Sequence, residues 1–452
     1  MPLFTIITIL VSCAAVLVWA NDRINRLPSS IGVMVGGVLI ASLLLIAQSL
    51  GLNVEWATNI LDQVHFSHLL LNLPDHKSTP GAGAILGLLL FATALRIEPT
   101  IFRRFRMSII LWLSTAGVVI TAFGTAAILY LIIWLIQGTP PAFINVLLFG
   151  VILAPTDPVA VIDMLAKSKV ISQVRDIVAG EALLNDATSI IMFLVVLALL
   201  PNNVAYSDLG GSTYFWITLF GYEIAGGLLT GAVIGFIANQ LIRTSRNSEV
   251  VALITLAAAL CSCVITPALN GSVPLAAVSC GLMIGQLGIS KHRTSAELAS
   301  NVWWVIENAL TTIIFLVVGL ILLKLDFFFW RSAIYGIVAV GILLLVRFIA
   351  VGIPWLFTKP TSRVAMDGEE VFLMTWCGIR GTVSLAMAVA IPAEILGEIT
   401  HESIESQMLI GTFMVVLVTM LLQGLTLPWV VRLLRNKEHR DRDMHNSSIK
   451  EI

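Results

Sequence analysis

The stretch Gly180-Glu-Ala-Leu-Leu-Asn-Asp-Ala-Thr-Ser-Ile190 carries two carboxylates and one amide within an apolar run that continues to Leu200. An acidic residue at the centre of a membrane-spanning helix costs roughly 2.5–3.5 kcal/mol on insertion scales, so each carboxylate must be paired, hydrated or used. At about 100° per residue, Glu181 and Asn185 lie about 40° apart on one helix face, whereas Asp186 is turned about 140° from Glu181. Because Glu181 and Asp186 face different directions, one carboxylate can have a structural partner while the other exchanges ligands.

The composition is that of an all-α polytopic membrane protein. Of the 452 residues, 58% are hydrophobic and only 12% are charged, whereas about 25% of the residues in an ordinary soluble domain are charged. The mean hydropathy is +0.96, and the net charge of −1 predicts no nucleic-acid partner. No cofactor is expected, because the cysteines lie in apolar segments and are interpreted as small core residues. They are Cys13, Cys261, Cys263, Cys280 and Cys377.

The distribution of basic residues predicts how the chain crosses the membrane. Windows of roughly twenty apolar residues give about thirteen spans. With the N-terminus outside, the inner loops and the C-terminal tail hold 21 of the 26 Lys and Arg residues, the outer loops hold three, and two lie inside spans. Because Lys and Arg concentrate on the cytoplasmic side, we expect the N-terminus outside and the C-terminus inside. The polar connection over residues 51–80 is left without an assigned role.

Two arginines lie inside predicted spans and need partners there. Arg347, in Leu343-Leu-Leu-Val-Arg-Phe-Ile349, requires a counter-ion, and Glu181 is the best candidate by depth. Arg380 lies between two glycines in Cys377-Gly-Ile-Arg-Gly-Thr-Val383. It is either a structural donor to backbone carbonyls freed by a helix break or a part of the functional site.

The predicted span over 142–166 contains the stretch Leu153-Ala-Pro-Thr-Asp-Pro-Val-Ala160. Its prolines remove backbone donors and clash with the preceding turn, so the helix should break around Thr156 and Asp157. A broken helix at membrane depth survives only in a protein interior or a water-filled cavity. There the Thr156 hydroxyl, the Asp157 carboxylate and freed carbonyls offer oxygen ligands to a cation. The alternative interpretation is a proline kink without function.

A second break is expected at Gly378–Gly381, in the predicted span over 369–393. It lies an odd number of spans after the first break, so the two broken helices have opposite orientations in the membrane. This arrangement indicates an inverted repeat with a binding site near the midplane. Asp157 and Arg380 carry opposite charges at the two breaks and would partly neutralise the crossing half-helix ends.

Other polar or small residues in spans received structural interpretations. Gly227, Gly231 and Gly235 mark close helix packing, either within the fold or across a dimer. Glu223, near the end of a span, is interpreted as an interfacial group and not a functional one. Glu307, within a span, and Asp163, at the inner end of a span, are interpreted as solvated or capping groups, and a role as funnel acids is the alternative.

In its motifs and their order, the chain closely resembles the monovalent cation/proton antiporters of the NhaP and Na+/H+ exchanger type. The matching features are Ala154-Pro-Thr-Asp-Pro-Val-Ala-Val161, Gly180-Glu-Ala-Leu-Leu-Asn-Asp-Ala187, Arg347 and Gly378-Ile-Arg-Gly-Thr382. The resemblance implies an NhaA/NhaP-like antiporter fold of about thirteen transmembrane helices, with inverted repeats and two broken crossing helices. It also implies a multi-pass protein of the cell (inner) membrane that works as a homodimer by elevator-like alternating access.

The domain organisation implied by this resemblance is a single transmembrane unit over 1–431 with a short cytoplasmic tail over 432–452 and no soluble regulatory domain. The partners are membrane lipid and a second copy of the chain. Within the unit, the implied core domain comprises residues around 108–200 and 327–431, and the implied dimerisation domain comprises residues around 1–97 and 213–323.

The resemblance also implies roles for single residues. Asp186 would bind the cation and exchange protons, with Asn185 as its neighbour, and Asp157 and Thr156 would be broken-helix ligands of Na+. Glu181 and Arg347 would form a core ion bridge, and Arg380 would compensate charge at the second break. The order Asn185-Asp186 resembles the electroneutral subgroup, which exchanges one cation for one proton. One departure is Ala92, which stands where some microbial members carry a glutamate in the third span.

The function expected from these residues is electroneutral Na+(Li+)/H+ antiport, so the protein is a secondary active transporter and not an enzyme. A K+/H+ antiporter of the same fold is an alternative, because the ligands are common to these cations. From other classes, a passive cation channel and an intramembrane aspartic protease using Asp157 and Asp186 were considered. The protease reading lacks Gly-x-Gly-Asp before its second acid and leaves the two buried arginines without a role.

Overall fold

The computed structural model describes most of the chain as helices. The described residues are 3–24, 29–52, 83–96, 104–157, 161, 172–200, 217–245, 247–287, 293–321, 330–357, 368–391, 398–399 and 402–434. Three features considered above fall outside them: residues 53–80 of the polar connection, Asp163, and the tail after residue 434.

Helices account for nearly all of the described secondary structure, which confirms the predicted all-α class. Strands β1 (Glu398–Ile399) and β2 (Glu402–Ser403) form one short antiparallel hairpin. Within the described residues, seven helices are long and apolar enough to cross a bilayer. They are Met107–Gln137, Ile177–Ala198, Gly221–Thr244, Ser248–Ala268, Glu297–Val317, Ala333–Leu356 and Gln407–Leu434. The total of about thirteen spans and the orientation stay predictions.

The first of two groups of packed helices contains both predicted helix breaks. In it, α7 packs against α8 and α17, α10 packs against α6 and α8, and α17 packs against α21. The members are α6 (Arg104–Ser114), α7 (Ala116–Gln137), α8 (Phe143–Ile152), α10 (Ser172–Ala198), α17 (Trp330–Phe357), α18 (Gly368–Trp376), α19 (Thr382–Val389) and α21 (Ile404–Thr419), which continues into the π-helix η5 (Met420–Gly424).

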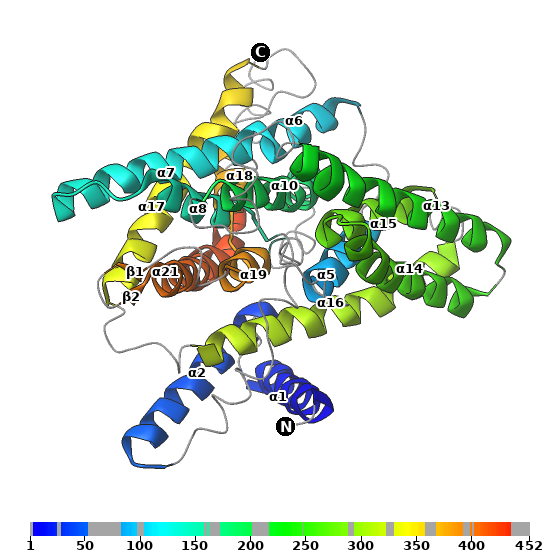
Figure 1. Cartoon of the computed structure of the whole chain (residues 1–452), viewed down its shortest axis with the longest axis horizontal. Helices are drawn as coiled ribbons and strands as arrows, with labels where there is room; N and C mark the ends of the chain where they lie inside the picture. Colours follow the sequence, from blue (N-terminus) through cyan, green and yellow to red (C-terminus); the bar gives the residue numbers. More distant parts are fainter. Residues whose placement is uncertain are drawn as a thin grey trace, which may run out of the picture.

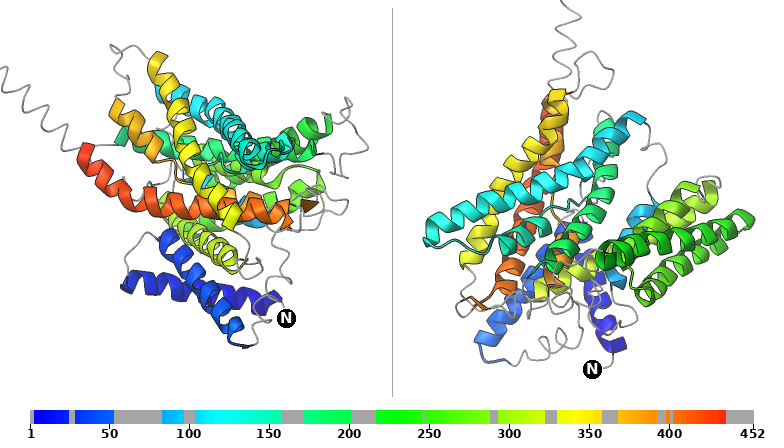
Figure 2. Two further views of the ribbon diagram at one scale, coloured as in Figure 1. Left: turned by 90° about the vertical axis from the view of Figure 1, so that its left-hand side faces the viewer. Right: turned by 45° about the horizontal axis from the view of Figure 1, so that its top comes forward.

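The second group surrounds α15, which packs between α5 and α13, while α16 packs against α2, α5 and α14. Figure 1 shows α13, α14 and α15 on one side of the molecule and α7, α8 and α17 on the other. In both views of Figure 2 the N-terminal helices α1 and α2 lie at one edge. The members are α1 (Leu3–Ile24), α2 (Ser29–Ser49), α5 (Ala84–Leu95), the π-helix η2 (Ile217–Gly226), α13 (Gly227–Thr244), α14 (Ser248–Ala268), α15 (Val273–Leu287) and α16 (Arg293–Ile321).

The glycine stripe of α13 packs within the fold, against α15. A Cβ atom on Gly231 would collide with the backbone of Ala276, and one on Gly235 would lie 2.9 Å from the carbonyl oxygen of Cys280. Both glycines are therefore needed for the close approach of two helices. The opposite face of α13 exposes large apolar side chains, as expected for contact with lipid. These include Leu229, Val233 and Phe236.

Candidate functional site

Two interrupted helices meet in the first group, and the structure confirms both predicted breaks. Helix α8 ends at Ile152, and the chain continues without helical structure through Asp157. Pro155 has no backbone N–H to continue the helix. Helix α18 ends at Trp376, and α19 begins at Thr382 after a second non-helical segment. Each break therefore leaves backbone groups that need partners inside the membrane.

Residues of each break supply hydrogen-bond partners to backbone groups of the other break. The backbone N–H of Asp157 donates to the carbonyl oxygen of Ile379 at 2.8 Å. Arg380, which is only 1% exposed, donates from Nη1 to the carbonyl oxygen of Ala154 and, at 3.0 Å, to that of Pro155. Of the two interpretations of Arg380, this geometry is that of a donor to carbonyls freed by the break. The guanidinium thus ties one broken helix to the other.

Gly381 allows the second break to lie directly against the first. A Cβ atom at this position would collide with the carboxyl group of Asp157. Gly378 is needed for a similar close approach, because a Cβ atom there would collide with the side chain of Arg347. The glycines on either side of Arg380 therefore serve close packing against two charged side chains, both buried.

A small cavity lies where the two groups of helices meet, and it holds three of the predicted ligands. Its volume is about 20 Å³, which is room for about one water-sized particle. Asp186 of α10 and both Thr156 and Asp157 of the first break line it. The remaining lining residues come from α5, α16, α19 and the two breaks: Leu89, Thr93, Pro155, Glu307, Thr311, Gly381, Thr382, Val383 and Ser384.

Asp186 has an unusual environment for a carboxylate. It is only 5% exposed, and none of the residues that the structure describes forms a hydrogen bond with its Oδ1 atom. A buried charge without partners is strongly unfavourable. A proton or a cation in the cavity would each neutralise the carboxyl group, and the Oδ1 atom is available to either.

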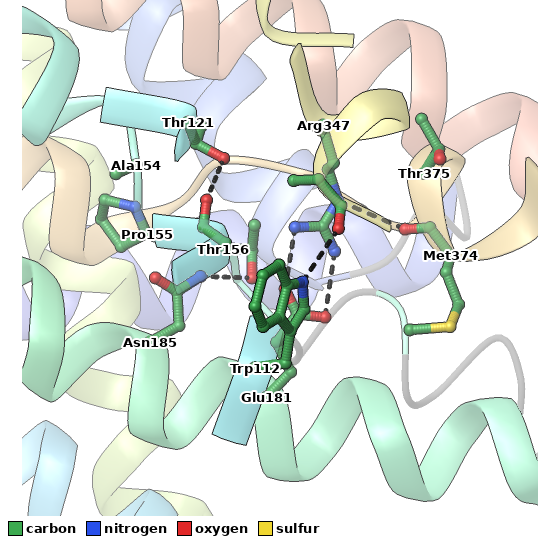
Figure 3. A network of polar contacts seen from close by, with 12 residues as sticks. Trp112, Thr121, Ala154, Pro155, Thr156, Glu181, Asn185, Arg347, Met374 and Thr375 are labelled. Atoms are coloured by element: carbon green, nitrogen blue, oxygen red, sulfur yellow. Dashed lines mark hydrogen bonds and ion pairs between the residues drawn. The ribbon is translucent and has the colours of Figure 1, made fainter. Parts of the chain in front are cut away.

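Asn185 orients the threonine of the broken helix (Figure 3). Its Nδ2 atom donates to Thr156 Oγ1 at 3.2 Å, and its Oδ1 atom accepts from Ser189 Oγ at 3.1 Å. Asn185 and Thr156 are 2% and 4% exposed. The amide thus connects α10 to the break beside Asp186, and it leaves the second lone pair of the Thr156 hydroxyl available to a ligand.

Glu181 and Arg347 form a buried ion pair on the side of α10 turned away from Asp186. Arg347 donates from Nη1 to Oε1 at 2.8 Å and from Nη2 to Oε2 at 3.1 Å, as Figure 3 shows. Its Nε atom also donates to the carbonyl oxygen of Met374 at 3.3 Å. This two-pronged geometry binds α10 to α17. Neither residue lines the cavity, so Glu181 and Asp186 of α10 face different neighbours.

Glu307, for which the sequence favours a solvated or capping role, lines the cavity. It is not solvated or capping but 2% exposed in α16, where it pairs with Arg96 and accepts a hydrogen bond from Thr93 Oγ1 at 3.2 Å. Glu223 is also buried within the protein, at 9% exposure in η2. An acid within an apolar span was the feature of the sequence that could have indicated a place in the site.

The donor set suits a small monovalent cation better than a transition metal. In the described part of the chain, no three His, Cys, Asp or Glu side chains come together as a metal cluster. The cavity instead offers carboxylate and hydroxyl oxygens beside a broken helix, which is the arrangement found at Na+ and H+ sites of secondary transporters.

Comparison with known proteins also relates the chain as a whole to transporters of a monovalent cation. Residues 6–433 match the sequence model of the family described as "Sodium/hydrogen exchanger, transmembrane". The Na+/H+ antiporter NhaP of Pseudomonas aeruginosa is 30% identical over 435 residues, which are 93% of this chain and 95% of the relative. The Na+/H+ antiporter ApNhaP of Aphanothece halophytica is 30% identical over 295 residues, or 63% of this chain and 52% of the relative.

Among solved structures, the sodium proton antiporter MjNhaP1 of Methanocaldococcus jannaschii at pH 8 has a similar fold. The TM-score is 0.73 at 19% identity, covering 95% of this chain and 99% of that one. This likeness confirms the predicted NhaP-type fold. The match over nearly the whole length shows that the chain belongs to the sodium/hydrogen exchanger family of membrane transporters.

Proposed function

We propose that this chain exchanges one Na+ or Li+ ion for one proton across the cell (inner) membrane, and that Asp186 is the carboxylate at which the two ions compete. The strongest support is the state of Asp186, which is buried with an unpaired oxygen in a cavity sized for about one water-sized particle. The relatives named Na+/H+ antiporters give the cation and the proton as the expected cargo.

The exchange of the two ions follows from the charge of the Asp186 carboxylate. A proton and a cation each neutralise the Asp186 carboxylate, but both cannot be bound to it at once. A charged, empty site crosses the hydrocarbon poorly, so the site moves only when one of them is bound. Asn185 adds no charge beside Asp186, and Arg380 is assigned to offset Asp157 at the crossing, so one positive charge travels in each direction and the cycle is electroneutral.

The ligands proposed for Na+ are Asp186, Asp157 and Thr156, with Asn185 holding Thr156 in place. Glu181 and Arg347 neutralise each other away from the cavity, so we assign them a structural role as the core ion bridge. Arg380 compensates charge and satisfies backbone carbonyls at the crossing.

Transport also requires that the site reach both sides of the membrane. We propose that the first group of helices is the mobile core, as expected for residues around 108–200 and 327–431. The second group would form the dimerisation domain of a homodimer, as expected for residues around 1–97 and 213–323. The cavity is lined from both groups, so relative movement of the two would change its access.

The test measures proton flux in proteoliposomes loaded with a pH dye, with Na+, Li+ or K+ added outside in separate runs. We expect Na+ and Li+ to alkalinise the lumen, at an initial rate that does not change when the membrane potential is clamped. Asp186→Asn should abolish this flux, because an amide binds neither ion in this way. Asp22→Asn, an exposed change in α1, is the matched control and should retain it.

Other outcomes identify the alternatives. Flux with K+ alone would indicate the K+/H+ antiporter, and cation movement without counter-transport of protons would indicate a channel. Activity that survives Asp186→Asn would refute the proposed role of this carboxylate. An aspartic protease is not favoured, because the related proteins are named as antiporters.

A further inference from the structure

The ion pair between Arg96 and Glu307 lies at the edge of the cavity and has no role in the exchange proposed above. Arg96 follows the last residue of α5, and Glu307 belongs to α16, 211 residues later in the chain. Glu307 Oε1 also accepts a hydrogen bond from Thr93 at 3.2 Å. Both partners come from the second group of helices, so the pair does not link that group to the first.

The two ends of this pair differ in their surroundings. The side chain of Glu307 is 3% exposed, whereas that of Arg96 is 27% exposed. Glu307 lines the same cavity as Asp157 and Asp186, and Arg96 does not. The carboxylate is therefore held at the buried cavity, while the guanidinium reaches it from a more exposed position.

Glu307 is held beside α5, where the Thr93 hydroxyl donates to its Oε1 atom. Glu307, Asp157 and Asp186 do not form one metal cluster among the described residues. All three line one cavity with room for about one water-sized particle, so a cation would contact Glu307 and Asp186 in succession and not at once.

We propose that Glu307 is a second cation-binding position, through which Na+ passes between the Arg96 side of the cavity and Asp186, and that Arg96 competes with the cation for it. This inference rests on the proposed function, since it assigns a further residue to the same transport path. When no cation is present, Arg96 neutralises Glu307. An arriving cation takes over this role, and the guanidinium withdraws toward the exposed end of α5.

Competition predicts opposite effects for the two partners, which a purely structural ion pair does not. Glu307→Gln removes the negative charge that attracts the cation, so the apparent KM for Na+ should rise about tenfold or more. Arg96→Gln removes the competitor, so the apparent KM should fall several-fold. The double variant should resemble Glu307→Gln, because Arg96 has nothing to compete for once the charge of Glu307 is lost.

The measurement is Na+-dependent proton flux in proteoliposomes over a range of Na+ concentrations, which separates KM from the maximal rate. Glu249→Gln and Arg243→Gln, both exposed positions outside the cavity, are the matched controls and should leave KM unchanged. Glu307→Asp keeps the charge and should lie between wild type and Glu307→Gln. If Glu307→Gln does not fold, Arg96→Gln alone decides, since an unchanged or higher KM contradicts competition.

The inference is overturned if Glu307→Gln keeps the wild-type KM, or if both single variants lower the maximal rate with KM unchanged, as a structural pair would. Asp186→Asn separates these results from failure of the proposed function. When Asp186→Asn is inactive and Glu307→Gln behaves like wild type, the exchange site stands and only the second position fails. When Asp186→Asn remains active, the proposed function itself fails.

Discussion

Replacing Glu181 by glutamine removes one charge from a buried ion pair with little change in shape. In the structure, Arg347 donates to both carboxylate oxygens at 2.8 and 3.1 Å. The two residues are 1% and 5% exposed. After the change, Arg347 keeps its hydrogen bond to Met374 but loses its counter-charge. Breaking a buried pair from one side costs about 3–5 kcal/mol. We expect this loss for Glu181→Gln and a similar loss for Arg347→Gln.

The double variant separates the charge from the other contacts. Glu181→Gln combined with Arg347→Gln leaves no uncompensated buried charge, which is the costly result of removing one partner alone. The double variant should therefore be more stable than either single variant. The difference between the double loss and the sum of the single losses measures the interaction of the pair.

Buried thiols provide the assay for these stabilities. Cys263, Cys280 and Cys377 are 2%, 0% and 1% exposed, so a thiol-reactive dye labels them only when the protein unfolds. Cys261 is exposed and Cys13 is partly exposed, so both are first replaced by serine in all variants. Thermal unfolding in detergent, followed by dye fluorescence, should place wild type highest, the double variant next and the single variants lowest.

Two results would refute this reasoning. If either single variant melts at the wild-type temperature, the pair does not stabilise the core. If the double variant loses as much stability as the two single variants together, the two side chains act independently. The bidentate contact between them would then contribute nothing to stability.

Two further predictions concern the crossing of the broken helices. Gly381→Ala introduces a Cβ atom into the Asp157 carboxyl group, so we expect a loss of about 1–3 kcal/mol from overpacking and strongly reduced exchange. Gly352→Ala, where no atom lies within 4 Å of the new Cβ, should match wild type in the thiol melt and the flux assay. Arg380→Met removes the donor to two buried carbonyls and should cost about 1–3 kcal/mol for each. Arg380→Lys should restore part of this stability, and equal melting of all three proteins would contradict the donor role.

Several parts of this fold follow from the sequence because their causes are local. The prolines around Asp157 interrupt a span without help from other helices, and the structure shows the break at that position. The glycines around Arg380 indicated the second break in the same way. Within α10, the angular spacing of Glu181 and Asp186 predicted different neighbours, and the structure places one against Arg347 and the other in the cavity.

The sequence also supported one pairing between distant residues. Arg347 and Glu181 are 166 residues apart, yet depth was enough to propose them as partners. A charge within a span needs an opposite charge at a similar depth, and few candidates met that condition. The pairing was predictable because the membrane restricts one coordinate of each residue.

Where depth in the membrane did not restrict the choice of partner, only the tertiary structure decided which side chains meet. Depth along the membrane says nothing about the rotation of a helix or its lateral neighbours, which depend on packing between many helices. The glycine stripe of α13 had two possible partners until α15 was seen against it. Glu307 was an acid of uncertain surroundings until α5 brought Thr93 and Arg96 to it at the edge of the cavity. Sequence thus determined where the chain breaks and where its charges lie in depth, and packing determined which of those charges share a site.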